Sequence, residues 1–263
     1  MRAPRRESRV DADVLLQAGH EGLKRNQGSG SAPSHGAAGI ARPEHQMTPV
    51  VADAAARVLR AHGVSVVRVP AFYPKLFAVK LGLALHFDGS GNPCSSGASV
   101  GYPPGLPLGS NKPTADLWKE IWGQYWPFRW MKDNFTRNLS GYYGYRRMST
   151  SIAEMLIEFG EISCPEQDAW LQPRLEWIGE VVAHFAGRVL QVDIPKPAPF
   201  GEPSPAIEPS ADPWDEDVAA LRLEIAELRA QVAALTGRTR RAPDPTVEGP
   251  PVIDLLDLDH EEW

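Results

Sequence analysis

The sequence has few cysteines and no long hydrophobic run. Among 263 residues only Cys94 and Cys164 are cysteines, and neither belongs to a CxxC pair, which argues against a zinc site built from cysteine. We expect both to be free thiols. No stretch is long enough to span a bilayer. The N-terminus starts basic but lacks the apolar core and cleavage pattern of a signal peptide. We therefore expect no membrane span and a chain that is cytoplasmic on synthesis.

The sequence also lacks an excess of positive charge. The net charge is −6, and both signs are spread along the chain. No basic stripe favours nucleic acid as a partner. The hydrophobic content of 43% is typical of one globular domain of ordinary size, with some length to spare.

The composition changes near Ile194, where the sequence becomes dense in proline. Proline fixes φ and cannot donate a ladder hydrogen bond, so this stretch reads as an extended linker. We divide the chain into a folded domain at 10–190, a Pro-rich linker at 191–216, a helix at 217–237 and an acidic tail at 238–263. The tail is expected to be disordered or to act as a partner motif.

The helix at 217–237 carries a heptad seam of alternating β-branched residues and leucine. The seam residues are Val218, Leu221, Ile225, Leu228, Val232 and Leu235. β-Branched residues at a with leucine at d favour a parallel two-stranded coiled coil, and so a homodimer. Because the run is under three heptads, a helix docked on its own domain stays an open alternative.

Within the folded domain, strand and helix patterns alternate. Strands are predicted at 13–17, 64–69, 81–86 and 155–159, and helices at 49–62, 73–80, 114–132 and 167–187. This alternation predicts an α/β fold with a mostly parallel twisted sheet flanked by helices. Sites in such sheets form at the carboxyl ends of the strands.

Imidazole and carboxylate side chains stand at those strand ends. His20, His86 and Glu158 each end or follow a predicted strand, and Glu44 lies just before a predicted helix. A catalytic zinc takes about three protein ligands from histidine and carboxylate and keeps one position open. His20, Glu44 and His86 supply such a set, which leaves Glu158 as a general base.

Other residues near these positions have alternative interpretations. His45 follows Glu44 and competes with it as a ligand, and His35 is a candidate substrate contact in a Gly/Ser-rich loop. Glu21 and Asp88 sit beside the two histidines. They would either orient the imidazoles through the second ring nitrogen or face water.

Four segments resemble sequence blocks of one enzyme family, in the family's order. They are DVLLQAGHEG, PEHQMTPVVADAAARVLRAHGVSVVRV, LALHFDGS and MLIEFGEISCPEQDAWL. They resemble the zinc-dependent N-acetylmuramoyl-L-alanine amidases of the amidase-3 type, which include phage endolysins and bacterial cell-wall amidases. The resemblance covers roughly residues 10–187 and implies a peptidoglycan substrate. It also implies that His20, Glu44 and His86 bind Zn²⁺ and that Glu158 is the catalytic carboxylate.

The chain departs from the family pattern around the expected pocket. Glu21 replaces a glycine, Phe87-Asp88-Gly89 replaces an alanine-asparagine motif, and Glu161 replaces a phenylalanine. These changes bear on the substrate more than on the metal. Two alternatives therefore stay open: an oligomeric, non-catalytic binding or scaffold protein on an amidase fold, and a zinc peptidase with a different substrate.

An aromatic stretch adds a further candidate for substrate binding. Trp118, Trp122, Trp126 and Trp130 recur at steps of four, which predicts one face of a helix. This face would pack against the sheet, or part of it would line a glycan groove together with the tyrosines Tyr142, Tyr143 and Tyr145. Arg146 and Arg147 are either surface charges or contacts for the oxyanion.

Overall fold

The computed structural model describes residues 11–23, 36–104 and 111–201. His35, most of the predicted linker, the predicted coiled-coil helix and the acidic tail lie outside the described residues. Within the described ranges, no helix combines the length and the apolar character that a membrane crossing needs.

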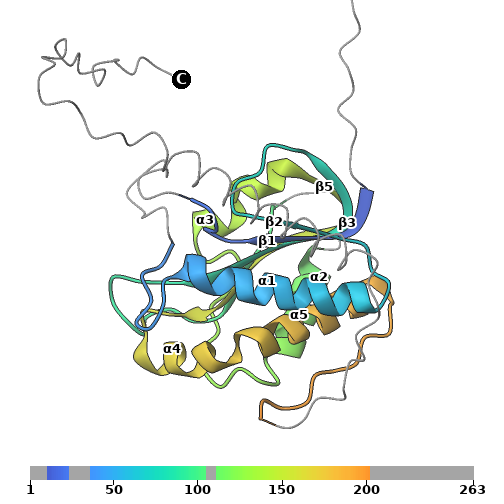
Figure 1. Cartoon of the computed structure of the whole chain (residues 1–263). Helices are drawn as coiled ribbons and strands as arrows, with labels where there is room; N and C mark the ends of the chain where they lie inside the picture. Colours follow the sequence, from blue (N-terminus) through green and yellow to red (C-terminus); the bar gives the residue numbers. More distant parts are fainter. Residues whose placement is uncertain (1–10, 24–35, 105–110, 202–263) are drawn as a thin grey trace, which may run out of the picture. The chain divides into compact units, whose positions relative to one another are not determined.

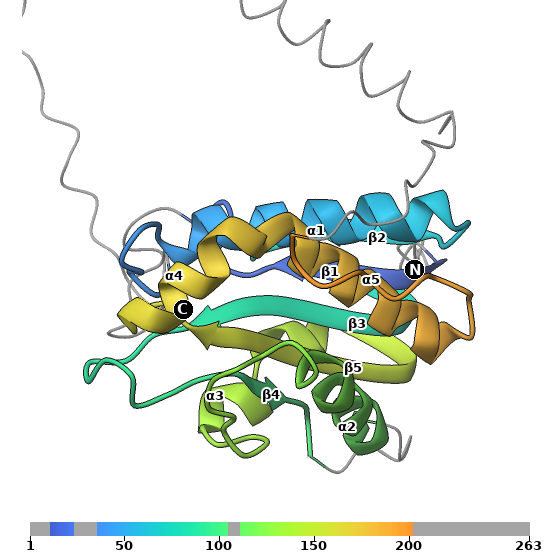
Figure 2. The same cartoon turned by 90° about the horizontal axis from the view of Figure 1, so that it is seen from below.

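A five-stranded sheet forms the centre of the domain, with strand order β2-β1-β3-β5-β4 (Figures 1 and 2). The strands β1 (Asp11–Ala18), β2 (Val66–Val69), β3 (Phe77–Asp88) and β5 (Met148–Glu161) run parallel. The edge strand β4 (Ser99–Gly101) is antiparallel to β5. The sheet is therefore mixed and mostly parallel. Its parallel strands bring their carboxyl ends to one edge, where the predicted site residues lie.

Two long helices cover one face of this sheet (Figures 1 and 2). They are α1 (Glu44–Ala61) and α5 (Leu175–Leu190). Gly179 lets them pack closely, since a Cβ there would lie 2.5 Å from the Cβ of Ala54. Alternate strand residues such as Val14 face these helices and are fully buried, as the period of two in a strand requires.

The opposite face carries a smaller cover made of α3 (Arg137–Ser140) and the 3-10 turn η1 (Tyr143–Arg147). Leu139 and Tyr145 pack there in one buried cluster with Ala84 of β3 and Leu156 of β5. The side chains of His86 and Glu158 point to this face too, because they share a parity with Ala84 of β3 and Leu156 of β5.

The aromatic stretch is mostly core. Helix α2 (Asn111–Trp122) stacks Trp118 on Trp122 with ring centroids 5.6 Å apart, and both rings are fully buried. Trp126 stacks on Trp122 from the irregular segment that follows. The interpretation that this aromatic face packs in the core is confirmed for these three rings. The predicted helix 114–132 is wrong beyond Trp122, where α2 ends. Gly123 and the nearby proline explain the early end.

Three further element predictions are corrected. Helix α1 begins at Glu44, a turn before the predicted start at Pro49, so proline is tolerated inside its second turn. The segment 73–80 is not a helix: from Phe77 it is the start of β3, where Phe77 and Val79 are buried in a cluster with Leu15. The predicted helix 167–187 is divided into α4 (Pro165–Leu171), the 3-10 turn η2 (Gln172–Arg174) and α5, since proline at 173 lacks an amide donor.

The two cysteines are not free thiols. Cys94 and Cys164 form a disulfide across 70 residues of sequence. Cys94 lies in the loop after β3, and Cys164 caps α4 after β5. Because β3 and β5 are neighbours in the sheet, the loops at their carboxyl ends meet, and sequence distance gave no sign of this.

Candidate metal centre

The candidate ligands come from three separate elements at the carboxyl edge of the sheet. His20 follows β1, Glu44 is the first residue of α1, and His86 lies near the end of β3. The backbone of His20 has φ 59°, the left-handed conformation that side chains other than glycine rarely adopt. Strained backbone of this kind clusters at functional sites.

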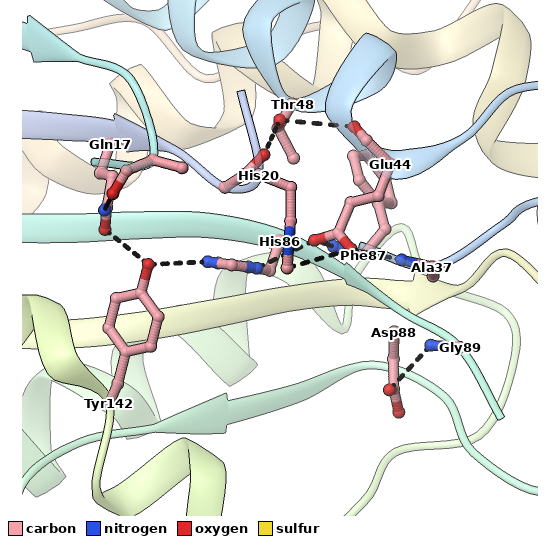
Figure 3. Close-up of polar contacts among 12 residues, drawn as sticks. Gln17, His20, Ala37, Glu44, Thr48, His86, Phe87, Asp88, Gly89 and Tyr142 are labelled. Carbon is pink, nitrogen blue, oxygen red and sulfur yellow. Dashed lines mark hydrogen bonds and ion pairs between the residues drawn. The ribbon is translucent and has the colours of Figure 1, made fainter. Parts of the chain in front are cut away.

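The three side chains meet around the Glu44 carboxylate (Figure 3). Glu44 Oε1 lies 2.9 Å from Nδ1 of His86, and Glu44 Oε2 lies 3.6 Å from Nε2 of His20. One potential ligand atom from each residue falls within 4.8 Å of the other two. The two imidazole rings meet edge to face with centroids 5.2 Å apart. These three residues are defined here as the His-Glu-His cluster.

Backbone amides and a helix end fix the Glu44 carboxylate. The amide of Ala37 donates to Oε2 at 2.9 Å, and the amide of Phe87 donates to Oε1 at 3.1 Å. The first turn of a helix also favours a negative charge. Burial acts to raise the pKa of Glu44, but the hydrogen bond to His86, the two imidazoles and the Ala37 amide outweigh it and lower the pKa. Glu44 is therefore an ionised carboxylate that is only 2% exposed.

Two glycines make room for the cluster. A Cβ at Gly36 would lie 2.1 Å from Glu44 Oε2 and 2.7 Å from a ring carbon of His20. A Cβ at Gly19 would lie 2.5 Å from the ring of His86. In addition, Thr48 donates from its hydroxyl to the carbonyl of Gly19 at 2.6 Å, which ties the His20 loop to α1. The loops are thus shaped around the three ligand groups.

The residues present fit a zinc ion. Bonds of about 2.1 Å in a tetrahedral site place donor atoms about 3.4 Å apart, and one potential ligand atom from each of the three residues lies within 4.8 Å of the others. Two imidazoles and one carboxylate also match the donor set of catalytic zinc sites. The oxygens of the buried Glu44 carboxylate face the ring nitrogens of His20 and His86. Such an arrangement needs a cation or a proton between the oxygen and the nitrogen.

Glu158 stands next to the cluster on β5. Glu158 lies directly beside His86, because the two residues are paired in the register of the neighbouring strands β5 and β3. Its Oε2 atom is buried and has no hydrogen-bond partner among the described residues. Burial raises the pKa of Glu158 well above its ordinary value, and the charges of Glu44 and Asp88 raise it further. A carboxylate held this way is poised to accept a proton.

The structure gives other roles to the flanking acidic residues. Glu21 pairs with Arg68, which also binds Asp53 of α1. Asp88 accepts hydrogen bonds from the hydroxyl of Ser96 and the amide of Gly89. Both contacts stabilise loops at the edge of the site.

Glu161 and Arg147 also have structural partners. Glu161 accepts hydrogen bonds from the side chains of Ser90 and Ser163 and from the amides of Cys94 and Ser96. It therefore holds the loop after β3 in place. Arg147 donates to the carbonyl of Pro74 and lies over the ring of Phe72. The interpretation of Arg147 as a surface charge fits this position better than a contact for the oxyanion.

Sequence reasoning missed the residue that contacts the far side of His86. The hydroxyl of Tyr142 lies 3.2 Å from Nε2 of His86, and the two rings meet edge to face. Tyr142 appeared in the sequence only as a candidate glycan contact. Its position 56 residues from His86 leaves no local pattern that predicts this pair.

The comparisons with known proteins place the fold. No family model matches the chain, and no curated protein matches it. Among solved structures, N-acetylmuramoyl-L-alanine amidase from Clostridium difficile 630 is similar with a TM-score of 0.50 and 14% identity, covering 69% of this chain and 97% of that one. The apo form of the N-acetylmuramyl-L-alanine amidase Ami1 from Mycobacterium abscessus has a TM-score of 0.50 and 16% identity, covering 68% and 98%. At these identities the likeness shows that the chain has the α/β fold of such amidases.

Proposed function

We propose that the protein is a zinc-dependent hydrolase that cleaves the amide bond between N-acetylmuramic acid and L-alanine in peptidoglycan. The observation that carries the proposal is the His-Glu-His cluster with Glu158 beside it, whose buried Oε2 atom has no hydrogen-bond partner among the described residues. His20, Glu44 and His86 would hold the zinc ion. The fold shared with N-acetylmuramoyl-L-alanine amidases supports the choice of bond.

When bound, zinc supplies Lewis-acid chemistry, which acidifies water and polarises a carbonyl. The protein's own contribution is a proton carrier. Glu158 would take the proton of the attacking water on Oε2 and return it to the nitrogen of the leaving amine. An amine is a poor leaving group until it is protonated, so the reaction needs a proton carrier beside the metal, and Glu158 is placed to be that carrier.

The loss of stability that a buried, unpartnered oxygen of Glu158 causes argues against a non-catalytic binding or scaffold protein. A buried carboxylate oxygen without a hydrogen-bond partner, such as Glu158 Oε2, destabilises a folded protein. A binding or scaffold protein has no use for such a group, whereas a hydrolase needs a base with a free oxygen at this position.

Digestion of purified peptidoglycan tests this function. The zinc-loaded protein is incubated with sacculi, and the new termini are identified by mass spectrometry. Free L-alanine amino termini together with intact lactyl groups on muramic acid would support the proposal. Cleavage within the stem peptide would instead assign a zinc peptidase, and no cleavage would leave a binding protein. Glu158→Gln, matched against the exposed-site variant Glu120→Gln, controls for a contaminating hydrolase.

The domain organisation is also proposed from the sequence. We infer that the catalytic unit spans 10–190 and is followed by a linker at 191–216, a dimerising helix at 217–237 and a tail at 238–263. Two catalytic units on one stalk would gain avidity for a polymeric wall, because the second contact becomes intramolecular.

A further inference from the structure

A chain of hydrogen bonds leads from the protein backbone to the far side of His86 (Figure 3). The side-chain amide of Gln17, on β1, donates to the carbonyl of Ala71 at 2.5 Å and to the hydroxyl of Tyr143 at 3.0 Å. Tyr142 donates its hydroxyl proton to Oε1 of Gln17 at 2.9 Å. The same hydroxyl oxygen lies 3.2 Å from Nε2 of His86.

The direction of every bond in this chain is fixed by one backbone carbonyl. The carbonyl oxygen of Ala71 can only accept, so the group of Gln17 that faces it must be the NH₂. Turning the amide round would bring two oxygens together at 2.5 Å. The oxygen of Gln17 therefore faces Tyr142, whose hydroxyl proton must point to it. The remaining lone pairs of Tyr142 face His86.

This order fixes a hydrogen on Nε2 of His86. A hydroxyl that has given its proton to Gln17 can only accept from the imidazole, so Nε2 of His86 carries a hydrogen. With a hydrogen fixed on Nε2, Nδ1 is the nitrogen that can give up its proton, and it faces Glu44 Oε1 at 2.9 Å. Without a metal a proton lies between these two atoms, and a bound metal would take its place. A metal ligand needs this nitrogen unprotonated, and a hydrogen bond at the other nitrogen is how proteins orient a ligand histidine.

We propose that Tyr142 and Gln17 are positioning residues that hold His86 as its Nε2–H tautomer, so that Nδ1 is the atom offered to the metal. This inference rests on the proposed metal centre. It makes Tyr142 a determinant of metal affinity, acting through His86 without touching the metal. The aromatic residue that the sequence suggested as a glycan contact thereby gains a different role.

Zinc affinity, measured by competition with a chromophoric chelator, tests the proposal without any substrate. Tyr142→Phe removes the acceptor hydroxyl, leaves the ring, and should weaken zinc binding about 10- to 100-fold. Tyr145→Phe is the matched control. Its hydroxyl donates to the carbonyl of Leu139 in the same cover of the sheet and so lies apart from the chain to His86. This control should bind zinc with unchanged affinity.

A second measurement uses the unchanged protein. Long-range ¹⁵N–¹H spectra of the zinc-loaded chain should show the His86 hydrogen on Nε2 and the metal on Nδ1. Equal zinc affinity in the unchanged protein and Tyr142→Phe, or zinc on Nε2 of His86, would overturn this inference and leave the proposed function intact. A chain that binds no zinc would overturn both. Zinc binding with the expected tautomer but no peptidoglycan cleavage would overturn the proposed function alone.

Discussion

Replacing Glu154 with glutamine should flatten the pH dependence of the protein's stability between about pH 4.5 and pH 8. Glu154 lies on β5, buried to 4% exposure, four residues before Glu158. Burial raises the pKa of its carboxyl from 4.5 to about 7. The side chain thus prefers to be neutral in the folded protein, whereas the unfolded chain ionises it at its ordinary pKa.

The difference between the folded and unfolded pKa of Glu154 sets the direction and the size of the effect on stability. A raised folded-state pKa gives a stability contribution that is fully present below about pH 4.5 and is lost as the pH rises through about 7. A pKa difference of this size corresponds to about 3 kcal/mol of unfolding free energy. Glutamine keeps the shape and has no charge to bury. As the pH rises to about 8, the free energy of unfolding of the variant should therefore exceed that of the unchanged protein by up to about 3 kcal/mol.

Urea denaturation at a series of pH values measures this gain, since the free energy of unfolding extrapolates linearly to water. The difference between variant and unchanged protein isolates Glu154 from all other titrating groups. Glu120→Gln, at an exposed position of α2, is the control for replacing a glutamate by glutamine. Parallel pH curves for the unchanged protein and Glu154→Gln would refute the reasoning.

Three other predictions follow from the site and the chain organisation. Glu158→Gln should keep the fold and the zinc but lose about 10²- to 10⁴-fold in amide hydrolysis, and near-normal turnover would reject its role as base. Replacing Cys94 and Cys164 with serine should cost up to about 4 kcal/mol of stability, because the disulfide closes a long loop of the unfolded chain; unchanged urea midpoints would contradict this. A chain truncated at Ala211 should fold and be monomeric while the full chain is dimeric by light scattering. Equal masses in both would reject the coiled coil in favour of a helix docked on its own domain.

The site residues at the ends of strands could be predicted from the sequence, because the carboxyl ends of parallel strands meet at one edge of a sheet. His20, His86 and Glu158 follow runs of apolar residues, and parallel strands bring their carboxyl ends to one edge. The structure places these residues together, and Glu44 joins them from the start of α1. Each residue is positioned by its own strand or helix, so local pattern could bring them to one edge, while the choice of ligands and base rested on the family resemblance as well.

Contacts between distant segments could not be predicted in the same way. The disulfide depends on two loops that meet only after β3 and β5 pair. The Tyr142 hydroxyl reaches His86 only because η1 folds back over the sheet. The segment from Phe77 became a strand because its alternate side chains are buried beside Leu15, a tertiary contact that overrides local helical preference.

Metal content is the most direct test of the His-Glu-His cluster. The full chain and the His86→Ala variant are each loaded with zinc, dialysed against buffer without metal, and measured by elemental analysis against protein concentration. We predict about one zinc per chain for the unchanged protein and loss of most of it in His86→Ala, with the fold retained by circular dichroism. Full zinc in the variant, or none in the unchanged protein, would contradict it.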